Sequence, residues 1–366
     1  MDFSLSTEQQ LLQDNLKRFW QEQPADGAVG QARWHHLLVD FGLGALVPQA
    51  GGESLHVEHA LVAETLGSEL VHEPFLESLV IAGHLLADLG GPVAEDLRQR
   101  MAQAQALPVL AWAEPGMRYD FRGAALRASR TAQGWSLNGS KCMVKAGPLA
   151  SHFLLLARTA GRVGEAAGLS LFVLARDTEG LRIDACPTVD GRQAADLHLQ
   201  DVQLEGAALL GEEGGALPYL ERARDIAVAA LCAEAKGLLG QMLEQTRVYL
   251  GERRQFGQRL ASFQVLQHRL VDMYLHLVKA TSASRLATLS LDQQGRRSLA
   301  ASSAQVVVAA ACRFIGQAAV QLHGGMGMCD EVRISQYFRR ATVIEREFGS
   351  RDFHLARYNA LHRTAP

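Results

Sequence analysis

The sequence lacks the features that mark several large classes of protein. Its formal net charge is only −3, which gives no indication of a nucleic-acid-binding surface. No uninterrupted apolar run reaches the ~20 residues that a helix needs to cross a bilayer. Residues 1–10 carry no basic stretch followed by an apolar one, so we expect neither a membrane span nor a secretory signal.

Cysteine is scarce and scattered along the chain. The five cysteines are odd in number and none belongs to a Cys-x-x-Cys pair. This pattern argues against a disulfide framework and against structural zinc, and we expect no metal site. The cysteine usage favours a protein of the reducing cytoplasm.

The pattern of apolar residues divides the 366-residue chain into three zones, which we take as three domains. Residues 1–105 show apolar side chains at helical spacing behind a possible cap at Ser6. Residues 106–208 contain short apolar and alternating runs typical of strands. Residues 209–366 favour long helices with short connections. We predict a mainly α protein with an N-terminal helical domain, a small antiparallel β domain and a C-terminal helical bundle.

Local signals locate individual elements within these zones. The pair Asn138-Gly139 predicts a hairpin turn at the end of a strand. Pro218 suits the first turn of a helix, and Ser262 could cap the next one. Three long helices are expected in the last zone, over residues 218–251, 262–291 and 298–322.

Two segments contain candidate binding residues. The first is Arg253-Arg254-Gln255-Phe256-Gly257, followed by Phe263-Gln264. Its arginine could be a solvated charge at a helix end, or its planar set of donors could hold a phosphate. The second is Gln321-Leu322-His323-Gly324-Gly325-Met326-Gly327. A glycine helix stop explains one of these glycines, whereas three in four positions allow successive N–H groups to form an anion-binding concavity.

In this order and spacing the two segments resemble the acyl-CoA dehydrogenase family. The resemblance covers the whole chain, including the opening residues and the runs Trp112-Ala113-Glu114-Pro115-Gly116 and Trp135-Ser136-Leu137-Asn138-Gly139-Ser140-Lys141. It implies the family's fold, in which the C-terminal helices form a four-helix bundle. It also implies FAD at a subunit interface and α,β-dehydrogenation of an acyl-CoA thioester.

The resemblance assigns one half of the flavin site to this chain. The groups that should contact the ADP half of FAD are Arg253, Gln255, Phe256, Gln264, Gln321, Gly324 and Gly325. In the family these groups serve a flavin whose ring lies in the neighbouring subunit. All of these positions are filled here.

The positions that face the flavin ring depart from the family. Its usual Thr-Glu-Pro-x-x-Gly-Ser-Asp run is matched here by a segment with Ala113 for the threonine and Arg118-Tyr119 for Gly-Ser. Its Trp-Ile-Thr run is matched by Met143-Val144-Lys145. Relative to the family, these positions lose hydroxyl groups and the tryptophan side chain and gain larger side chains. We therefore predict that this chain does not bind a flavin ring in its own β domain.

The catalytic base of the family is also missing. Dehydrogenation needs a carboxylate to take the α proton as hydride leaves the β carbon. The family's glutamate is matched by Phe348, and the position that some members use on the first long helix is matched by Ala227. Glu347 is one step away, which turns a side chain by ~100° on a helix, so an ion-pair or surface role is favoured. Glu234 lies seven residues after Ala227, roughly two turns further along the helix.

The ending Phe348-Gly349-Ser350-Arg351-Asp352-Phe353-His354 resembles the small subunits of heteromeric pimeloyl-CoA and steroid side-chain acyl-CoA dehydrogenases. It implies a non-catalytic subunit paired with a homologous catalytic one in an α2β2 assembly. The acyl-CoA would lie mainly in the partner, and an electron-transfer flavoprotein would be the acceptor. The alternative is a self-sufficient homo-oligomeric dehydrogenase whose base is Glu347 or Glu234. A flavin-free relic is disfavoured by the retained ADP-contacting set.

Overall fold

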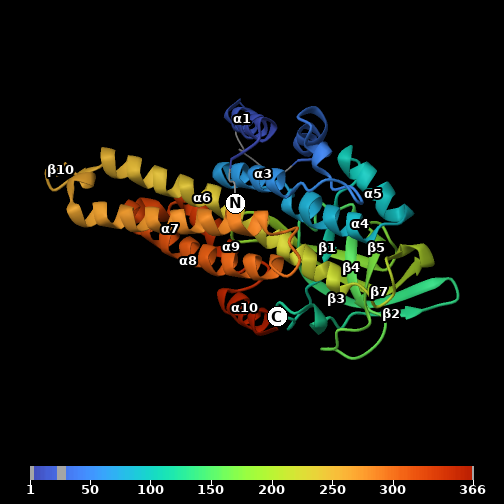
Figure 1. Ribbon diagram of the computed structural model, residues 1–366. Helices are drawn as coiled ribbons and strands as arrows, with labels where there is room; N and C mark the ends of the chain where they lie inside the picture. The colour runs from blue at the N-terminus through green and yellow to red at the C-terminus, as the bar shows by residue number, and fades with distance from the viewer. Residues whose placement is uncertain (1–3, 23–29, 365–366) are drawn as a thin grey trace. The chain divides into compact units, whose positions relative to one another are not determined.

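The computed structural model describes residues 4–22 and 30–364 and groups the chain into two compact units (Figure 1). Of the described residues, 4–22, 56–72 and 225–364 form the helical unit, and 30–55 and 73–224 form the sheet unit. Helices of the N-terminal zone therefore contribute to both units. The division by sequence order into residues 1–105, 106–208 and 209–366 stays a prediction.

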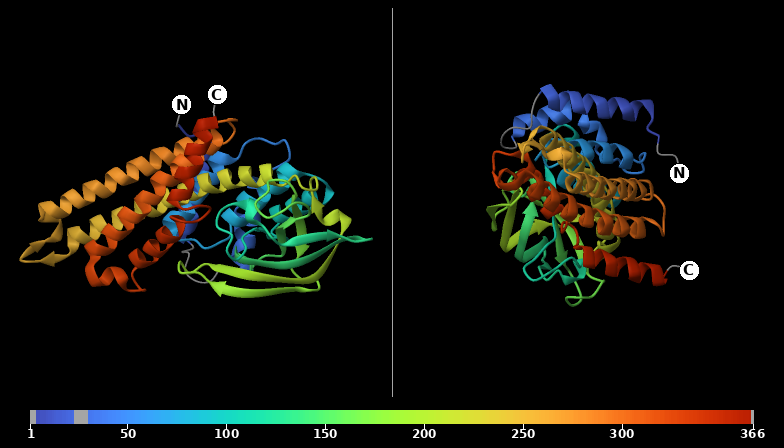
Figure 2. Two further views of the ribbon diagram at one scale, coloured as in Figure 1. Left: turned by 90° about the horizontal axis from the view of Figure 1, so that it is seen from below. Right: turned by 90° about the vertical axis from the view of Figure 1, so that its left-hand side faces the viewer.

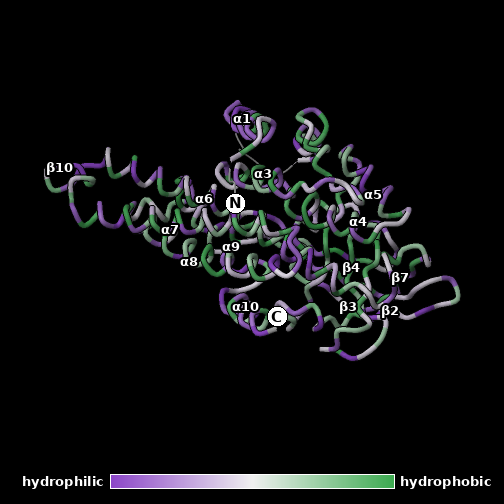
Figure 3. Tube along the Cα trace, in the orientation of Figure 1, coloured by the Kyte–Doolittle hydropathy of each residue, from purple (hydrophilic) through white to green (hydrophobic). Residues whose placement is uncertain are grey.

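The helical unit is built on three long helices with apolar inner faces. Its elements are α1 (Thr7–Glu22), α3 (His56–Glu69), α6 (Leu217–Glu252, which begins in the sheet unit), α7 (Gln264–Leu289), α8 (Arg297–His323), α9 (Arg333–Ile344) and α10 (Arg351–Thr364). Figure 2 shows the long helices side by side, and Figure 3 shows hydrophobic and hydrophilic residues alternating along them, as expected for helices with one buried face. The three predicted long helices are confirmed.

Two of these helices, α6 and the stretch Arg297–Met328 that includes α8, are long and apolar enough to cross a membrane by length and composition alone. Their most apolar windows are 72% and 56% buried inside the protein. This burial is the behaviour of core helices, whose apolar surface is covered by neighbouring elements.

The sheet unit surrounds an eight-stranded sheet. Its order is β6-β7-β3-β2-β4-β5-β8, with β1 paired parallel to β4. The strands are β1 (Pro108–Ala111), β2 (Arg127–Arg130), β3 (Gly134–Lys145), β4 (His152–Arg158), β5 (Leu169–Ala175), β6 (Leu181–Pro187), β7 (Gln193–Glu205) and β8 (Leu209–Leu210). The helices of this unit are α2 (Gln31–His35), α4 (Gly83–Leu89) and α5 (Pro92–Ala102), with π-helical turns over His36–Asp40 and Leu76–Ala82. Trp135 and Phe172 meet edge to face in the core of the sheet.

The predicted hairpin turn at Asn138-Gly139 is wrong. Strand β3 continues through both residues, and its register against β7 shifts between Leu137 and Gly139. The Asn138 side chain donates to Asp201 Oδ1 at 3.0 Å and accepts from Asp201 N at 2.8 Å, so it replaces the missing ladder bonds. Gly139 has φ +144°, which suits glycine. The register shift is a β-bulge whose extra residue lies on β7, where Gln200 and Asp201 face the single Asn138.

The predicted caps have different outcomes. Ser6 Oγ accepts from Gln9 N at 3.2 Å and the Gln9 side chain accepts from Ser6 N at 3.0 Å, which confirms a capping box at the start of α1. Ser262 does not cap α7, because its hydroxyl donates to Arg259 O at 2.5 Å and the helix begins after Phe263.

Helices α3 and α6 cross with their backbones in contact. A Cβ added to Gly67 would lie 2.1 Å from Glu234 O, and one added to Gly237 would lie 1.9 Å from Glu64 O. Only a residue without a side chain permits this approach. Two glycines, one on each helix, therefore fix the spacing of α3 and α6.

We expect Gly237→Ala to lower the free energy of unfolding by about 1–3 kcal/mol, because the helices must separate to admit the methyl group. Gly240→Ala on the same helix is the matched control, since a Cβ there meets nothing within 4 Å. The control should be neutral or stabilising by up to about 1 kcal/mol, from the better helix propensity of alanine. Urea denaturation of both variants measures the difference, and equal effects would contradict the close crossing.

Candidate functional site

The first candidate segment joins α6 to α7 at one end of the helical unit, near the label β10 in Figure 1. Strands β9 (Arg254–Gln255) and β10 (Gln258–Arg259) pair antiparallel and form a small hairpin. Phe256 and Gly257 form its two-residue turn, with φ +54° and +80°. Left-handed backbone is uncommon for phenylalanine, and here it accompanies a ring that is 88% exposed. The tip of the hairpin thus offers a large apolar ring to a partner.

The polar residues predicted in this segment are exposed. Arg253, Gln255 and Gln264 lie at the surface, and none of their side chains has a hydrogen-bond or ion-pair partner within residues 4–22 and 30–364. These donors are therefore available to a ligand from outside the chain, as a contact to an anionic diphosphate requires.

The second candidate segment ends α8. Gly324 has φ +62° and begins a short 3-10 turn over Gly324–Met328. A Cβ on Gly324 or Gly325 would meet nothing within 4 Å, whereas one on Gly327 would lie 2.7 Å from Val320 O. The first two glycines therefore present bare backbone to the outside, and the third serves internal packing. Gln321 is exposed on the last turn of α8.

A pair of rings connects the two segments. Tyr249, one turn before Arg253, stacks on His323 with centroids 4.4 Å apart, and its hydroxyl donates to His323 O at 3.4 Å. Burial lowers the pKa of His323, so the ring is neutral against Tyr249 at physiological pH. The sequence does not reveal this contact of Tyr249, because nothing in its local pattern indicates a partner 74 residues away. The structure brings the ends of α6 and α8 together, and their exposed donors and open backbone fit the ADP half of FAD.

The segment that should contain the base has a tight backbone turn. It lies between α9 and α10, and Phe348 adopts φ +57° before Gly349 at φ +146°. Phe348 is half-buried. Ala227, the alternative position on α6, is 1% exposed. Neither side chain can accept a proton.

Both candidates for a relocated base bind the same arginine. Arg340 on α9 donates to both carboxylate oxygens of Glu234, at 2.7 and 2.8 Å, and to Glu347 Oε2 at 2.9 Å. Their side chains are 3%, 5% and 6% exposed, respectively. Glu347 is therefore a buried ion-pair residue, and one guanidinium is shared by two carboxylates 113 residues apart.

In the sheet unit a second buried ion pair joins Glu114, next to Ala113, to Lys141 on β3. Glu114 accepts from Lys141 Nζ at 2.6 Å and from the backbone N–H groups of Ala125 and Leu126. Burial lowers the pKa of Lys141 to about 8, opposed by the charge of Glu114. The lysine is still mostly protonated at neutral pH, so the pair is ionic.

At two of the positions that differ from the family's pattern, Tyr119 and Met143, the backbone is bound by side chains of this chain. Tyr119 O accepts from Arg224 at 2.6 Å, and Arg224 in turn lies 4.1 Å from the centre of the Phe121 ring. Met143 has φ +52°, is 48% exposed, and its N–H donates to Asp196. Among the described residues no group of three His, Cys, Asp or Glu side chains is placed to hold a metal ion.

Removal of Arg340 should leave two buried carboxylates without a countercharge. We expect Arg340→Met to lower the free energy of unfolding by about 3–5 kcal/mol. The deficit should shrink as pH falls, since the unpaired carboxylates then have raised pKa values in the folded state and protonation neutralises them. Urea denaturation at neutral and acidic pH measures both effects.

Arg339→Met is the matched control on the same helix. Its ion pair with Asp330 is 36% and 81% exposed, so its loss should cost less than about 1 kcal/mol. Equal destabilisation by the two substitutions would contradict the role of Arg340.

Comparisons with known proteins agree with this architecture. Residues 109–205 match the acyl-CoA dehydrogenase middle domain, and residues 220–360 match the acyl-CoA dehydrogenase C-terminal domain. Cyclohexane-1-carbonyl-CoA dehydrogenase of Geobacter metallireducens is 26% identical over 320 residues, which cover 84% of this chain and 83% of that protein.

Two solved structures share the fold over nearly the whole chain. Butyryl-CoA dehydrogenase from Megasphaera elsdenii has a TM-score of 0.89 at 22% identity, covering 99% of this chain and 100% of that one. A chain of the ChsE4-ChsE5 complex from Mycobacterium tuberculosis has a TM-score of 0.85 at 23% identity, covering 100% of both chains.

The two matched domains together span more than half of the sequence and follow the family's order. The family is one of FAD-binding oxidoreductases. This chain belongs to the acyl-CoA dehydrogenase family.

Proposed function

We propose that this chain is a non-catalytic subunit of a heteromeric FAD-dependent acyl-CoA dehydrogenase, and that it supplies the ADP half of the FAD site to a homologous catalytic partner. The observation that carries the proposal is a contrast within the helical unit. Glu234 and Glu347 are both bound to buried Arg340. The polar side chains of the ADP-contacting set are instead exposed and have no hydrogen-bond or ion-pair partner among the described residues; they are Arg253, Gln255, Gln264 and Gln321.

The division of labour follows from the residues present. FAD, when bound, accepts the hydride from the acyl chain. In this chain Arg253 would hold a phosphate, Gln255, Gln264 and Gln321 would add hydrogen bonds, and Phe256 would cover an apolar part of the ligand. The backbone at Gly324 and Gly325 would admit the diphosphate closely. The proton would be taken by a carboxylate of the partner.

An exposed apolar face on α7 supports association with another subunit. Val271, Tyr274, Leu275 and Val278 recur at spacings of three and four, so they lie on one side of the helix. Each is between 42% and 56% exposed. A helix face of this kind is expected to be covered in an assembly. With the opposite face buried through Met273 and Ala280, α7 has two apolar sides, one for the core and one for a partner.

A similar fold occurs in an assembly of two differently named chains, the ChsE4-ChsE5 complex. We place this chain in an analogous α2β2 heterotetramer, with acyl-CoA bound mainly in the partner and an electron-transfer flavoprotein as acceptor. We assign it to the cytoplasm, where its five free cysteines would stay reduced. Steroid, dicarboxylate and fatty acyl groups are all compatible with these residues.

The alternative is a self-sufficient enzyme with a relocated base. It is favoured by one observation, that Glu347 Oε1 is buried without a hydrogen-bond partner in the described structure. A carboxylate oxygen of this kind could accept a proton if the turn opened.

We expect the chain alone to oxidise saturated acyl-CoAs at least about 10²-fold more slowly than its complex, because a general base typically contributes ~10²–10⁴-fold. Turnover with an artificial electron acceptor measures this. Robust activity of the isolated chain that disappears in Glu347→Gln, but persists in the neighbouring Glu345→Gln, would establish the relocated base and overturn the non-catalytic assignment.

Arg253→Ala should weaken FAD binding by the complex about ten- to a hundred-fold, since a charge-assisted hydrogen bond contributes ~1.5–3 kcal/mol. Arg247→Ala is the control on the same helix, because that guanidinium already binds Glu244 at 2.6 Å. Flavin titration of the apo-complex gives the dissociation constants. If the affinity for FAD is unchanged in Arg253→Ala, Arg253 is only a solvated charge at a helix end and does not contact the cofactor.

A further inference from the structure

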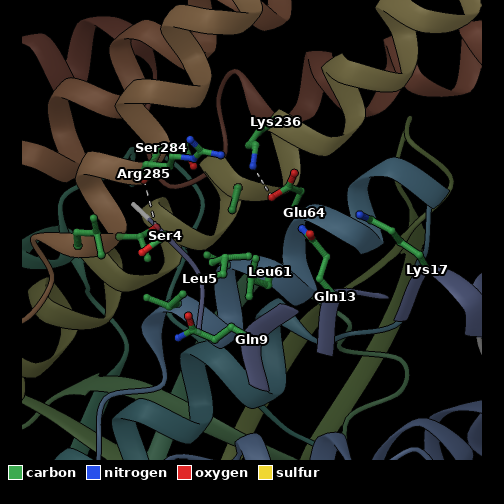
Figure 4. Close-up of a pocket in the computed structure, with 15 residues that line it drawn as sticks. Ser4, Leu5, Gln9, Gln13, Lys17, Leu61, Glu64, Lys236, Ser284 and Arg285 are labelled. Atoms are coloured by element: carbon green, nitrogen blue, oxygen red, sulfur yellow. Dashed lines mark hydrogen bonds and ion pairs between the residues drawn. The ribbon is translucent and has the colours of Figure 1, made fainter. Parts of the chain in front are cut away.

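The helical unit contains a cavity of about 440 Å³ between α1, α3, α6 and α7 (Figure 4). Its volume is within the ~300–1,000 Å³ of small-molecule sites. All of the residues that line it belong to the helical unit, so the cavity is complete within one compact body.

The cavity is separate from both segments described above. Helix α6 lines it with Ala233 and Lys236. Lys236 is nine residues after Ala227, which places it about half a turn round the helix, on the opposite face. Glu234, seven residues after Ala227, shares the face of Ala227. The ADP-contacting segment begins 17 residues after Lys236, roughly 25 Å further along the helix axis.

Two walls of the cavity are preformed. Glu64 on α3 binds Lys236 on α6 at 2.5 Å, next to the point where Gly67 and Gly237 bring the two backbones into contact. Helix α1 is held on α3 by the Gln9 amide, which donates to Glu58 at 2.9 Å. A ligand would therefore enter a site whose shape exists before binding, which lowers the entropy cost of association.

The lining combines apolar surface with excess positive charge. The apolar side chains are Leu5, Val57, Ala60, Leu61, Ala233 and Leu289. The charged side chains are Lys17, Lys236 and Arg285 against one carboxylate, Glu64. Lys236 is neutralised by Glu64, whereas Lys17 and Arg285 have no acidic partner in the part of the chain that the structure describes.

Arg285 is the best placed of these cations to hold a head group. Figure 4 shows it on the same side of the cavity as Lys236, with Lys17 apart from both. Its neighbour Ser284 is 2% exposed, and the Ser284 hydroxyl has no hydrogen-bond partner among the described residues. A guanidinium beside a free hydroxyl at the rim of an apolar cavity suits a carboxylate with an apolar tail.

We propose that this cavity is a second ligand site that binds an amphipathic carboxylate of the medium-chain fatty-acid type. The alkyl chain occupies the apolar lining, and the carboxylate binds Arg285 with Ser284. Lys17 adds to the positive potential that attracts the anion. A fully hydrophilic anion gains nothing from the apolar walls, and a neutral alkyl alcohol gains nothing from the two uncompensated cations.

The proposal is tested by calorimetric titration of the purified protein with decanoate, at concentrations where decanoate does not form micelles. Decanol is titrated in the same way as the neutral probe. Decanoate should bind at least about tenfold more tightly than decanol, and its affinity should fall as salt is added. Arg285→Gln should weaken decanoate binding about tenfold and leave decanol binding unchanged, because one charge-assisted hydrogen bond is lost.

Lys279→Gln is the control on the same helix. Lys279 is an exposed cation that does not line the cavity. It lies six residues before Arg285, so its side chain points about 240° away around the helix axis. Ala60→Phe, which fills the cavity, should abolish binding of both probes. Equal binding of decanoate and decanol, equal weakening by Arg285→Gln and Lys279→Gln, or decanoate binding retained in Ala60→Phe would overturn the proposal. So would release of flavin by decanoate, which would assign the binding to the flavin site.

Discussion

The cluster of Arg340 with Glu234 and Glu347 joins three parts of the helical unit: the middle of α6, the helix α9 and the turn before α10. A single buried guanidinium binds two buried carboxylates. Removing the guanidinium, or moving either carboxylate away from it, would leave a buried charge without a partner, which is strongly destabilising. Because Glu347 is bound to Arg340, the next residue, Phe348, is held in a left-handed turn, at the position that we predict to match the family's base. For either glutamate to serve as a base it would have to leave Arg340, at a cost of several kcal/mol. The contact that stabilises this region thus also disfavours a relocated base.

Exposed features elsewhere in the helical unit suit one subunit of an assembly of two different chains. Phe256 at the hairpin tip and the outer face of α7 expose apolar side chains, and Arg253 lacks a partner in the described chain. In the proposed assembly these features meet a homologous chain and its flavin. The positions that we predict to match the family's ring-facing residues differ. There the backbones of Met143 and Tyr119 are bound by Asp196 and Arg224, and Ala113 has no hydroxyl. In the proposed assembly this chain would thus retain one half of a flavin site and lack the other.

The sequence predicted most of the fold because its signals are strong and local. The long C-terminal helices repeat an apolar pattern over many turns, and their extents were predicted to within a few residues. The errors came from signals whose outcome depends on distant residues. Asn138-Gly139 is typical of a hairpin turn. Here Asp201 on β7 forms two hydrogen bonds with the Asn138 side chain, and strand β3 continues through both residues. The sharing of Arg340 by Glu234 and Glu347, and the stacking of Tyr249 on His323, depend on helix packing that no local pattern records.

The number of flavins per assembly tests the central claim most directly. The chain is to be co-expressed with a homologous subunit that retains the ring-facing hydroxyls and the catalytic glutamate. Flavin absorbance is then compared with the protein mass from light scattering. The account predicts two flavins in an α2β2 tetramer, one for each pair of unlike subunits. Four flavins per tetramer, or a homotetramer of this chain that binds flavin unaided, would contradict it.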